Sequence, residues 1–129
     1  YLDIAINREP NVGQYYNSKG SILARIGRFD ESFAAFAKAI ELEPNNALFL
    51  ESLGFAYVDL GNKLNEDATY LDNKAYAKAK VEIDAAYNNA LPYFEKAYEL
   101  EPDNDSFKHS LRSLYYRLGM NDKYEALAD

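Results

Sequence analysis

Histidine and carboxylate side chains are the groups in this sequence best suited to chemistry, and neither kind forms a recognisable site. His109 is the only histidine, and catalysis or metal binding by histidine needs partner groups at defined spacings. The acidic run at 99–105 lacks the spacing and turn glycine of a calcium loop, so a helix end followed by a helix start explains it better. Cysteine is absent, which excludes thiolate chemistry. The sequence therefore predicts no enzyme, no cofactor and no metal site.

The charge balance argues against nucleic acid and membrane partners. The 129 residues include 14 basic and 21 acidic side chains, for a net charge of −7, and they form no basic stripe. No apolar run approaches the roughly 18 residues of a membrane-spanning helix, and no signal peptide is visible. We expect the partner to be another protein or a peptide, with a homo-oligomer as the alternative.

A repeated helix ending supplies the framework that would position binding residues. The ending Glu-Leu-Glu-Pro-Asn of the stretch 27–46 has close counterparts within 5–11 and 97–103. Pro10 and Pro44 lie 34 residues apart, a period typical of stacked helical hairpins. The sequence therefore predicts an all-α solenoid.

Apolar spacing and stop residues predict ordinary helices at about 1–9, 14–26, 31–43, 47–60, 106–118 and 122–127. Asp30, and either Asn45 or Asn46, are expected to cap the helices that follow them. Three glycines are expected to end the helices that precede them, in the left-handed conformation: Gly27, Gly61 and Gly119.

The helix at 14–26 also contains Gly20, which indicates close approach of the neighbouring helix because glycine there costs about 1 kcal/mol relative to alanine. Ile22 and Ile26 are expected to widen its buried face, and Ala37 is expected on the buried face of the helix at 31–43.

The stretch between Gly61 and the next helix-ending proline is about 24 residues too long for the period. It is helical in pattern, because apolar residues continue at spacings of three and four from Tyr76 to Ala97. Asn65 could start a helix there. We predict one long helix that reaches back from Glu101 past Tyr76, and that either kinks near Pro92 or restarts with Asn88 as cap.

At these positions the chain resembles the tetratricopeptide repeat family. The matching residues are Tyr16, Gly20, Leu23, Phe36, Ala39, Pro44, Leu50, Leu53, Gly54, Tyr57, Ala90, Phe94, Ala97 and Pro102. Lys19, Ser32, Lys108 and Arg112 depart from the family pattern. The resemblance implies a right-handed superhelix of hairpins. The inserted segment and the chain ending resemble a bacterial branch of the family, many of whose members are exported, which favours an exported or periplasmic location.

The expected organisation is a single domain, 1–129, that is part of a longer protein. Its parts are the tail of a preceding repeat at 1–12, a repeat at 13–46, a repeat at 47–104 with a helical insertion at about 62–86, and a C-terminal capping hairpin at 105–129.

The family resemblance also implies where a partner would bind, because the first helices of such repeats line a concave face. The corresponding residues are Asn17, Ser21, Arg25, Glu51, Phe55, Asp59, His109, Ser113, Tyr116 and Arg117. We expect this face to hold a peptide or protein segment without catalysis, the plain alternative being an ordinary solvated helix surface. A second hypothesis is a structural element that self-associates through the long helix or the open N-terminal end.

One subgroup of the family grips a C-terminal carboxylate with lysine, arginine and asparagine at set positions. The residues at those positions here are Asn17, Ser21, Ser52, Ser106 and Ser110. Since these provide no cation, we do not expect binding of a chaperone tail in that manner.

Overall fold

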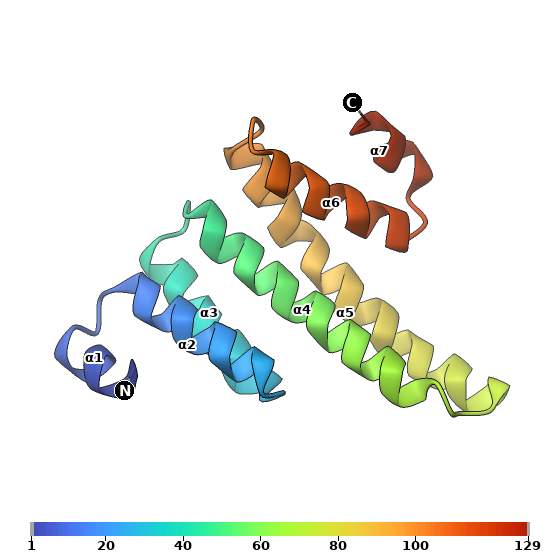
Figure 1. The fold of residues 1–129 in the computed structure, drawn as a ribbon, viewed down its shortest axis with the longest axis horizontal. Coiled ribbons are helices and arrows are strands. Elements are labelled where there is room, and N and C mark those ends of the chain that lie inside the picture. The colour runs from blue at the N-terminus through green and yellow to red at the C-terminus, as the bar shows by residue number, and fades with distance from the viewer. Residues whose placement is uncertain (1, 129) are drawn as a thin grey trace.

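The computed structural model describes residues 2–128, which form seven α-helices and no strand (Figure 1). In chain order the helices are α1 (Leu2–Arg8), α2 (Gly13–Arg25), α3 (Phe29–Leu42), α4 (Ala47–Ala68), α5 (Asn73–Leu100), α6 (Asp105–Arg117) and α7 (Asn121–Ala126). The all-α prediction is confirmed. Tyr1 and Asp129, the outermost residues of the expected first helix and of the expected domain, lie outside the described part.

The two joints between hairpins are built from the same four-residue sequence pattern, Glu-Pro-X-Asn. Proline follows the end of α3 and of α5, and the asparagine then caps the next helix. Asn46 Oδ1 accepts a hydrogen bond from Phe49 N at 3.2 Å, and Asn104 Oδ1 accepts one from Phe107 N at 3.2 Å. Each asparagine satisfies a backbone donor that would otherwise lack a partner at the start of its helix.

The predicted cap of α3 was wrong, whereas two of the three helix-ending glycines behave as expected. Asp30 lies inside the first turn of α3, which begins at Phe29 and has no side-chain cap bond. Gly27 and Gly119 have φ values of +83° and +72°, the left-handed conformation that ends α2 and α6.

The α2–α3 hairpin closes on Gly20, as the sequence predicts. A Cβ at this position would lie 2.8 Å from the Phe36 ring. Ser32, which departs from the family's alanine, is fully buried and its Oγ donates a 2.7 Å hydrogen bond to the Gly20 carbonyl oxygen. The departure is therefore accommodated by a satisfied buried hydroxyl.

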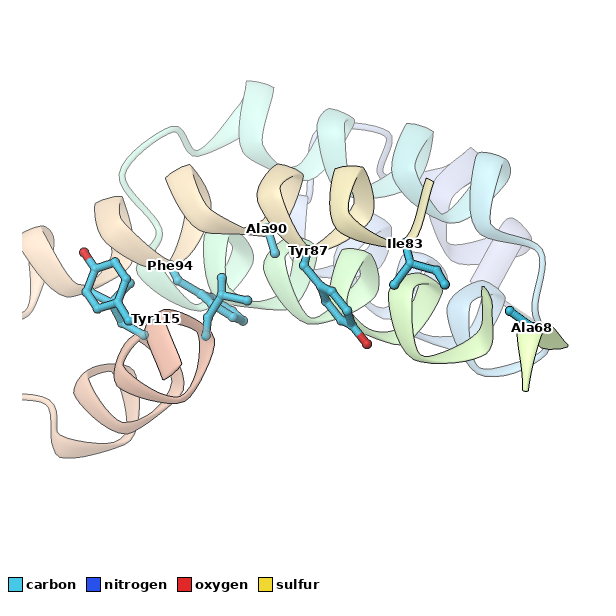
Figure 2. Close-up of a cluster of buried hydrophobic side chains, with 8 residues drawn as sticks. Ala68, Ile83, Tyr87, Ala90, Phe94 and Tyr115 are labelled. Atoms are coloured by element: carbon cyan, nitrogen blue, oxygen red, sulfur yellow. The ribbon is translucent and has the colours of Figure 1, made fainter. Parts of the chain in front are cut away.

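The α4–α5 hairpin repeats this contact and then extends it. A Cβ at Gly54 would lie 2.5 Å from the Phe94 ring, and one at Gly61 would lie 2.6 Å from the Tyr87 ring. Buried Ala68 follows seven residues after Gly61. Because seven residues are close to two helical turns, small residues keep facing α5, and Figure 2 shows Phe94, Tyr87 and Ile83 along that helix.

Two predictions about this segment were wrong. Gly61 does not end a helix, because α4 continues to Ala68, and Asn65 lies in its interior instead of starting a helix. The extra residues lengthen both arms of one hairpin, so that α4 has 22 residues and α5 has 28.

The long second arm was predicted correctly. Asp72 caps α5 by accepting a hydrogen bond from Ala75 N at 2.8 Å. The helix then runs through Pro92 to Leu100, so the alternative of a restart at Asn88 was wrong. The Asn88 side chain instead donates to the Asp84 carbonyl oxygen at 2.9 Å.

Helix α6 packs on α5 and completes the largest cluster of buried side chains. Leu111, Leu114 and Tyr115 join Phe94 in this cluster, and the Tyr115 hydroxyl donates to Glu95 Oε2 at 2.8 Å. Burial, reinforced by Glu95, raises the pKa of Tyr115. The core therefore lies both within the hairpins and between them, as in a solenoid.

Three residues expected on buried faces are exposed. Ile22 and Ile26 lie on α2 with 47% and 60% of their surface exposed, and Ala37 is exposed on α3. Leu23, Ala24 and Ala35 are buried instead. The apolar stripes are narrower than the sequence indicates, and the isoleucines form part of the N-terminal end surface.

Candidate ligand-binding face

Helices α2, α4 and α6 present the ten residues predicted to contact a partner, and Figure 1 shows α4 between the other two helices. Eight of the ten line three pockets between neighbouring helices. We call this surface the α2–α4–α6 face, and its pocket-lining predicted residues are Ser21, Arg25, Phe55, Asp59, His109, Ser113, Tyr116 and Arg117.

The pocket between α2 and α4 has a volume of about 300 Å³ and carries both signs of charge. Arg25 and Asp59 line it together with Ser21, Ser52 and the Phe55 ring. Among residues 2–128, neither Arg25 nor Asp59 has a salt-bridge partner, and burial raises the pKa of the Asp59 carboxyl. An incoming polar group would therefore meet two charges that are free to bind it.

The pocket between α4 and α6 is mainly apolar, with a volume of about 230 Å³. Its apolar lining residues are Phe55, Val58, Phe94 and Leu114. Phe55 is 43% exposed, lies edge-on to Phe94 with ring centroids 5.1 Å apart, and also lines the α2–α4 pocket. One exposed ring therefore connects two neighbouring pockets.

The pocket between α6 and α7 is the largest of the three, at about 400 Å³. It shares His109, Ser113 and Arg117 with the α4–α6 pocket, so the two pockets adjoin along this row of α6, one toward α4 and the other toward α7. Its remaining lining residues are Arg112, Tyr116 and Tyr124.

Arg112 and Tyr124 were not among the predicted site residues, although the sequence contains a signal for the first. Arg112 occupies the position at which the preceding repeats have Gly20 and Gly54. In those repeats the absent side chain lets a ring of the partner helix approach. In α6 the guanidinium lies 3.9 Å from the centre of the Tyr124 ring, and Nε donates to the Tyr124 carbonyl oxygen at 3.2 Å.

Arg117 is less free than the sequence suggests. Its Nη1 donates to the Tyr87 hydroxyl at 2.9 Å and to Asn62 Oδ1 at 3.3 Å, and the guanidinium lies over the Tyr87 ring at 4.8 Å. Tyr87 in turn donates to Asn62 Oδ1 at 2.7 Å. Residues of the lengthened hairpin therefore orient a cation of the α2–α4–α6 face.

Asn17 and Glu51 are the two predicted residues that do not line the pockets. They hold equivalent positions on α2 and α4, and Asn17 Oδ1 and Glu51 Oε2 are buried without a hydrogen-bond partner among the described residues. Burial raises the pKa of Glu51, and a hydrogen bond with Ser110 offsets part of this rise. Desolvation favours the neutral carboxyl, which makes Glu51 a pH-sensitive point of the fold.

The described residues contain no group of three or more His, Cys, Asp or Glu side chains that could hold a metal ion. No helix within 2–128 has the length and apolar character needed to cross a membrane.

The fold and the pockets define a helical-hairpin repeat protein whose first helices form a common, indented surface. Comparison with known proteins is consistent with this class. A family profile described as "TPR repeat" matches residues 20–61, and one described as "Tetratricopeptide repeat" matches residues 85–104. The two matched stretches are therefore similar to tetratricopeptide repeats, which are generally protein-interaction elements.

Solved structures share the architecture at low sequence identity. A structure titled "IFIT1 monomeric mutant", with Gppp-AAAA, superposes with a TM-score of 0.84 at 19% identity, over 98% of this chain and 27% of that chain. The present chain thus spans about a quarter of that protein's length. This likeness supports the fold, and the sequence has no significant match among curated proteins.

Two further structures align with lower overall similarity. The MamA RS-1 ArsTM double mutant has a TM-score of 0.45 at 19% identity, over 98% of this chain and 75% of that chain. The first TPR of Spaghetti (RPAP3), bound to an HSP90 peptide, has a TM-score of 0.36 at 23% identity, over 84% of this chain and 94% of that chain.

Proposed function

We propose that the chain is a protein-interaction module that holds an extended segment of another protein across the α2–α4–α6 face, without catalysis. The observation that carries the proposal is the row of pockets that share lining residues: Phe55 joins the first two, and α6 residues join the last two. Tetratricopeptide repeats generally act in protein interactions, which supports the same assignment.

The physical properties of the row suit an extended chain better than a compact small molecule. Each pocket lies between a different pair of helices, and helices are about 10 Å across with their side chains. An extended peptide covers about 3.3 Å per residue, so neighbouring pockets would receive side chains about three residues apart. Exposed rings such as Phe55 and Tyr116, which is 68% exposed, provide apolar anchors of the kind that dominate interface energies.

Replacement of Phe55 by alanine tests this proposal, because the ring lines two pockets at once. Peptides selected from a random library for binding to the unaltered chain provide the probe, and fluorescence anisotropy measures their affinity. We expect Phe55→Ala to weaken binding about tenfold or more, as for a truncated interface anchor.

Leu48→Ala is the matched control. Leu48 lies on the same helix and is 63% exposed, but it lines none of the three pockets. Equal effects of the two variants, or a library that yields no binding peptide, would contradict recognition on this face.

Self-association is the second candidate, because apolar side chains are exposed at the far end of the long hairpin. Tyr70 is 95% exposed, Leu71 45% and Val81 71%. At the N-terminal end Ile4 and Ile26 are each 60% exposed. Exposed apolar groups that gather in one place favour association.

Sedimentation velocity over a range of concentrations distinguishes these surfaces. Loss of an oligomer in Tyr70→Ser/Val81→Ser would assign contact to the hairpin tip, whereas loss in Ile4→Ser/Ile26→Ser would assign it to the N-terminal end. If the protein is monomeric at every concentration, the result would contradict self-association.

A further inference from the structure

The pocket between α6 and α7 has a charge opposite to that of the whole chain. The net charge of the protein is −7, yet the six residues that line this pocket include two arginines and a histidine and no carboxylate. In the α2–α4 pocket, by contrast, Arg25 faces a surface that also contains Asp59. The positive end of the row of pockets is therefore at α6–α7.

Both guanidinium groups of this pocket are held in place by aromatic rings. Arg112 is stacked on Tyr124 and bonds the Tyr124 carbonyl oxygen through Nε alone. Arg117 is held by Tyr87 and Asn62 through Nη1 alone. Neither arginine has a carboxylate partner among residues 2–128. Since a guanidinium has five N–H donors, each arginine retains donors for a ligand, at little further entropic cost.

The repeat pattern changes at one position in the lining of this pocket. Where α2 and α4 have glycine, and the partner helix closes against it, α6 has Arg112. Its side chain extends to Tyr124 of the short helix α7, and both residues line the pocket of about 400 Å³. Tyr116 and Tyr124 form an aromatic wall, with ring centroids 5.4 Å apart.

We propose that the α6–α7 pocket is a subsite for an aspartate or glutamate side chain of the bound segment. The carboxylate is received by Arg112 and Arg117, and its aliphatic stem packs on Tyr116 and Tyr124. The adjoining apolar pocket toward α4 then receives a large apolar side chain about three residues away. This inference rests on the proposed function and specifies the chemistry of the segment that binds.

The proposed subsite differs from the site at which one subgroup of the family binds a C-terminal carboxylate. Two positions of that site are occupied here by Ser106 and Ser110, which supply no cation. The proposed subsite instead lies toward α7 and uses a residue of that helix. The geometry points to an internal acidic residue because the pocket is large enough for a whole side chain with its stem. Comparison of peptides that have free or amidated C-termini distinguishes binding of a side-chain carboxylate from binding of the terminal carboxylate.

The test is selection of random heptapeptides on the full chain and on two variants of equal charge loss. Arg112→Gln/Arg117→Gln removes both cations of the subsite. Lys74→Gln/Lys78→Gln removes two exposed cations of α5 that line none of the three pockets. Circular dichroism and thermal unfolding establish that each variant is folded. A further variant, Arg112→Lys, keeps the positive charge at position 112 and leaves Arg117 unaltered.

We expect enriched peptides to carry Asp or Glu about three residues from a large apolar side chain. Replacement of that acid by its amide should weaken binding to the unaltered chain about tenfold, and should have little effect on binding to Arg112→Gln/Arg117→Gln. Amidation of the C-terminus should leave affinity unchanged, and Arg112→Lys should retain a preference for the acid.

Three results would overturn the inference while leaving the proposed function intact. These are enrichment without an acidic residue, an acidic preference that survives loss of both arginines, and affinity that depends on a free C-terminus. Failure to enrich any peptide would instead contradict the proposed function itself, so the two failures are distinguishable.

Discussion

The α4–α5 and α6–α7 hairpins differ in length and in the residue at one repeat position, which is glycine in α4 and arginine in α6. A close helix contact lies at this position in the first hairpin and a pocket in the second. Gly54 allows the Phe94 ring to pack directly on the α4 backbone. Arg112, at the equivalent position of α6, lies beside Tyr124 and leaves a pocket of about 400 Å³. Equivalent repeat positions can therefore lie at a close helix contact in one unit and line a pocket in another.

The largest effect is expected from placing a side chain in the closed hairpin. Gly54→Leu inserts methylene groups where even a Cβ would lie 2.5 Å from Phe94, and should lower the free energy of unfolding by about 3 kcal/mol. Arg112→Leu, in the open hairpin, should cost about 1 kcal/mol or less because that side chain is half-buried. Urea unfolding of both variants measures the difference. Equal losses of free energy of unfolding would show that the two hairpins are equally tolerant at this position.

A smaller effect distinguishes Gly61 from Gly27, which hold the same position in consecutive repeats. Gly27 is left-handed and open, whereas Gly61 is helical and faces Tyr87. Asparagine tolerates the left-handed region, so Gly27→Asn should cost only a few tenths of a kcal/mol, about as little as an asparagine C-cap. Gly61→Asn should cost about 2 kcal/mol through overpacking. Thermal unfolding checks the order, and a greater loss at Gly27 would contradict it.

The hydrogen bonds of the Tyr87 hydroxyl, which link the long hairpin to α6, should contribute about 1 kcal/mol to the free energy of unfolding. Tyr87→Phe removes the hydroxyl that donates to Asn62 and accepts from Arg117, and a typical net loss per hydrogen bond is about 1 kcal/mol. Tyr98→Phe is the control, because the Tyr98 hydroxyl has no hydrogen bond among the described residues. A loss no greater than that of the control would show that Arg117 and Asn62 are satisfied without the Tyr87 hydroxyl.

The smallest effect concerns pH and the position shared by Asn17 and Glu51. Because burial raises the pKa of Glu51 above its ordinary 4.5, the folded state holds this proton more tightly than the unfolded chain. Below the pKa that Glu51 has in the unfolded chain, the protonated carboxyl does not reduce the free energy of unfolding. As pH rises through the pKa that it has in the folded state, ionisation of the buried carboxyl destabilises the fold. Glu51→Gln should therefore increase Tm relative to the unaltered chain at about pH 7, and less at about pH 4.

Glu82→Gln controls for the loss of one negative charge, since Glu82 is exposed on α5. A Glu51→Gln effect that is independent of pH would show that packing rather than titration distinguishes Asn17 from Glu51.

The fold could be predicted because its signals are local and repeated. Pro44 and Pro102 follow helix ends, Asn46 caps the next helix, and Gly20 is small because Phe36 approaches it. Each of these signals depends on a short stretch of sequence and recurs in the next repeat.

The error at Gly61 has the opposite origin, because it depends on a distant partner. Gly61 and Gly27 are indistinguishable in sequence, and only Tyr87, on the returning arm, gives Gly61 its role. In the same way, Arg112 becomes part of a pocket through Tyr124, and Arg117 is anchored by Tyr87. Eight of the ten residues chosen from the repeat pattern line pockets, whereas the side chains that contact them were not predictable.

The two Glu-Pro-X-Asn joints have a practical consequence for labelling this protein. Both joints lie at the same end of the α4–α5 hairpin, and its connecting turn between Ala68 and Asn73 lies at the opposite end (Figure 1). A fluorophore or a fused reporter domain inserted at Thr69 or Tyr70 would be carried at the tip of a long rod. Such a tag would lie outside the three pockets of the α2–α4–α6 face, which Thr69 and Tyr70 do not line.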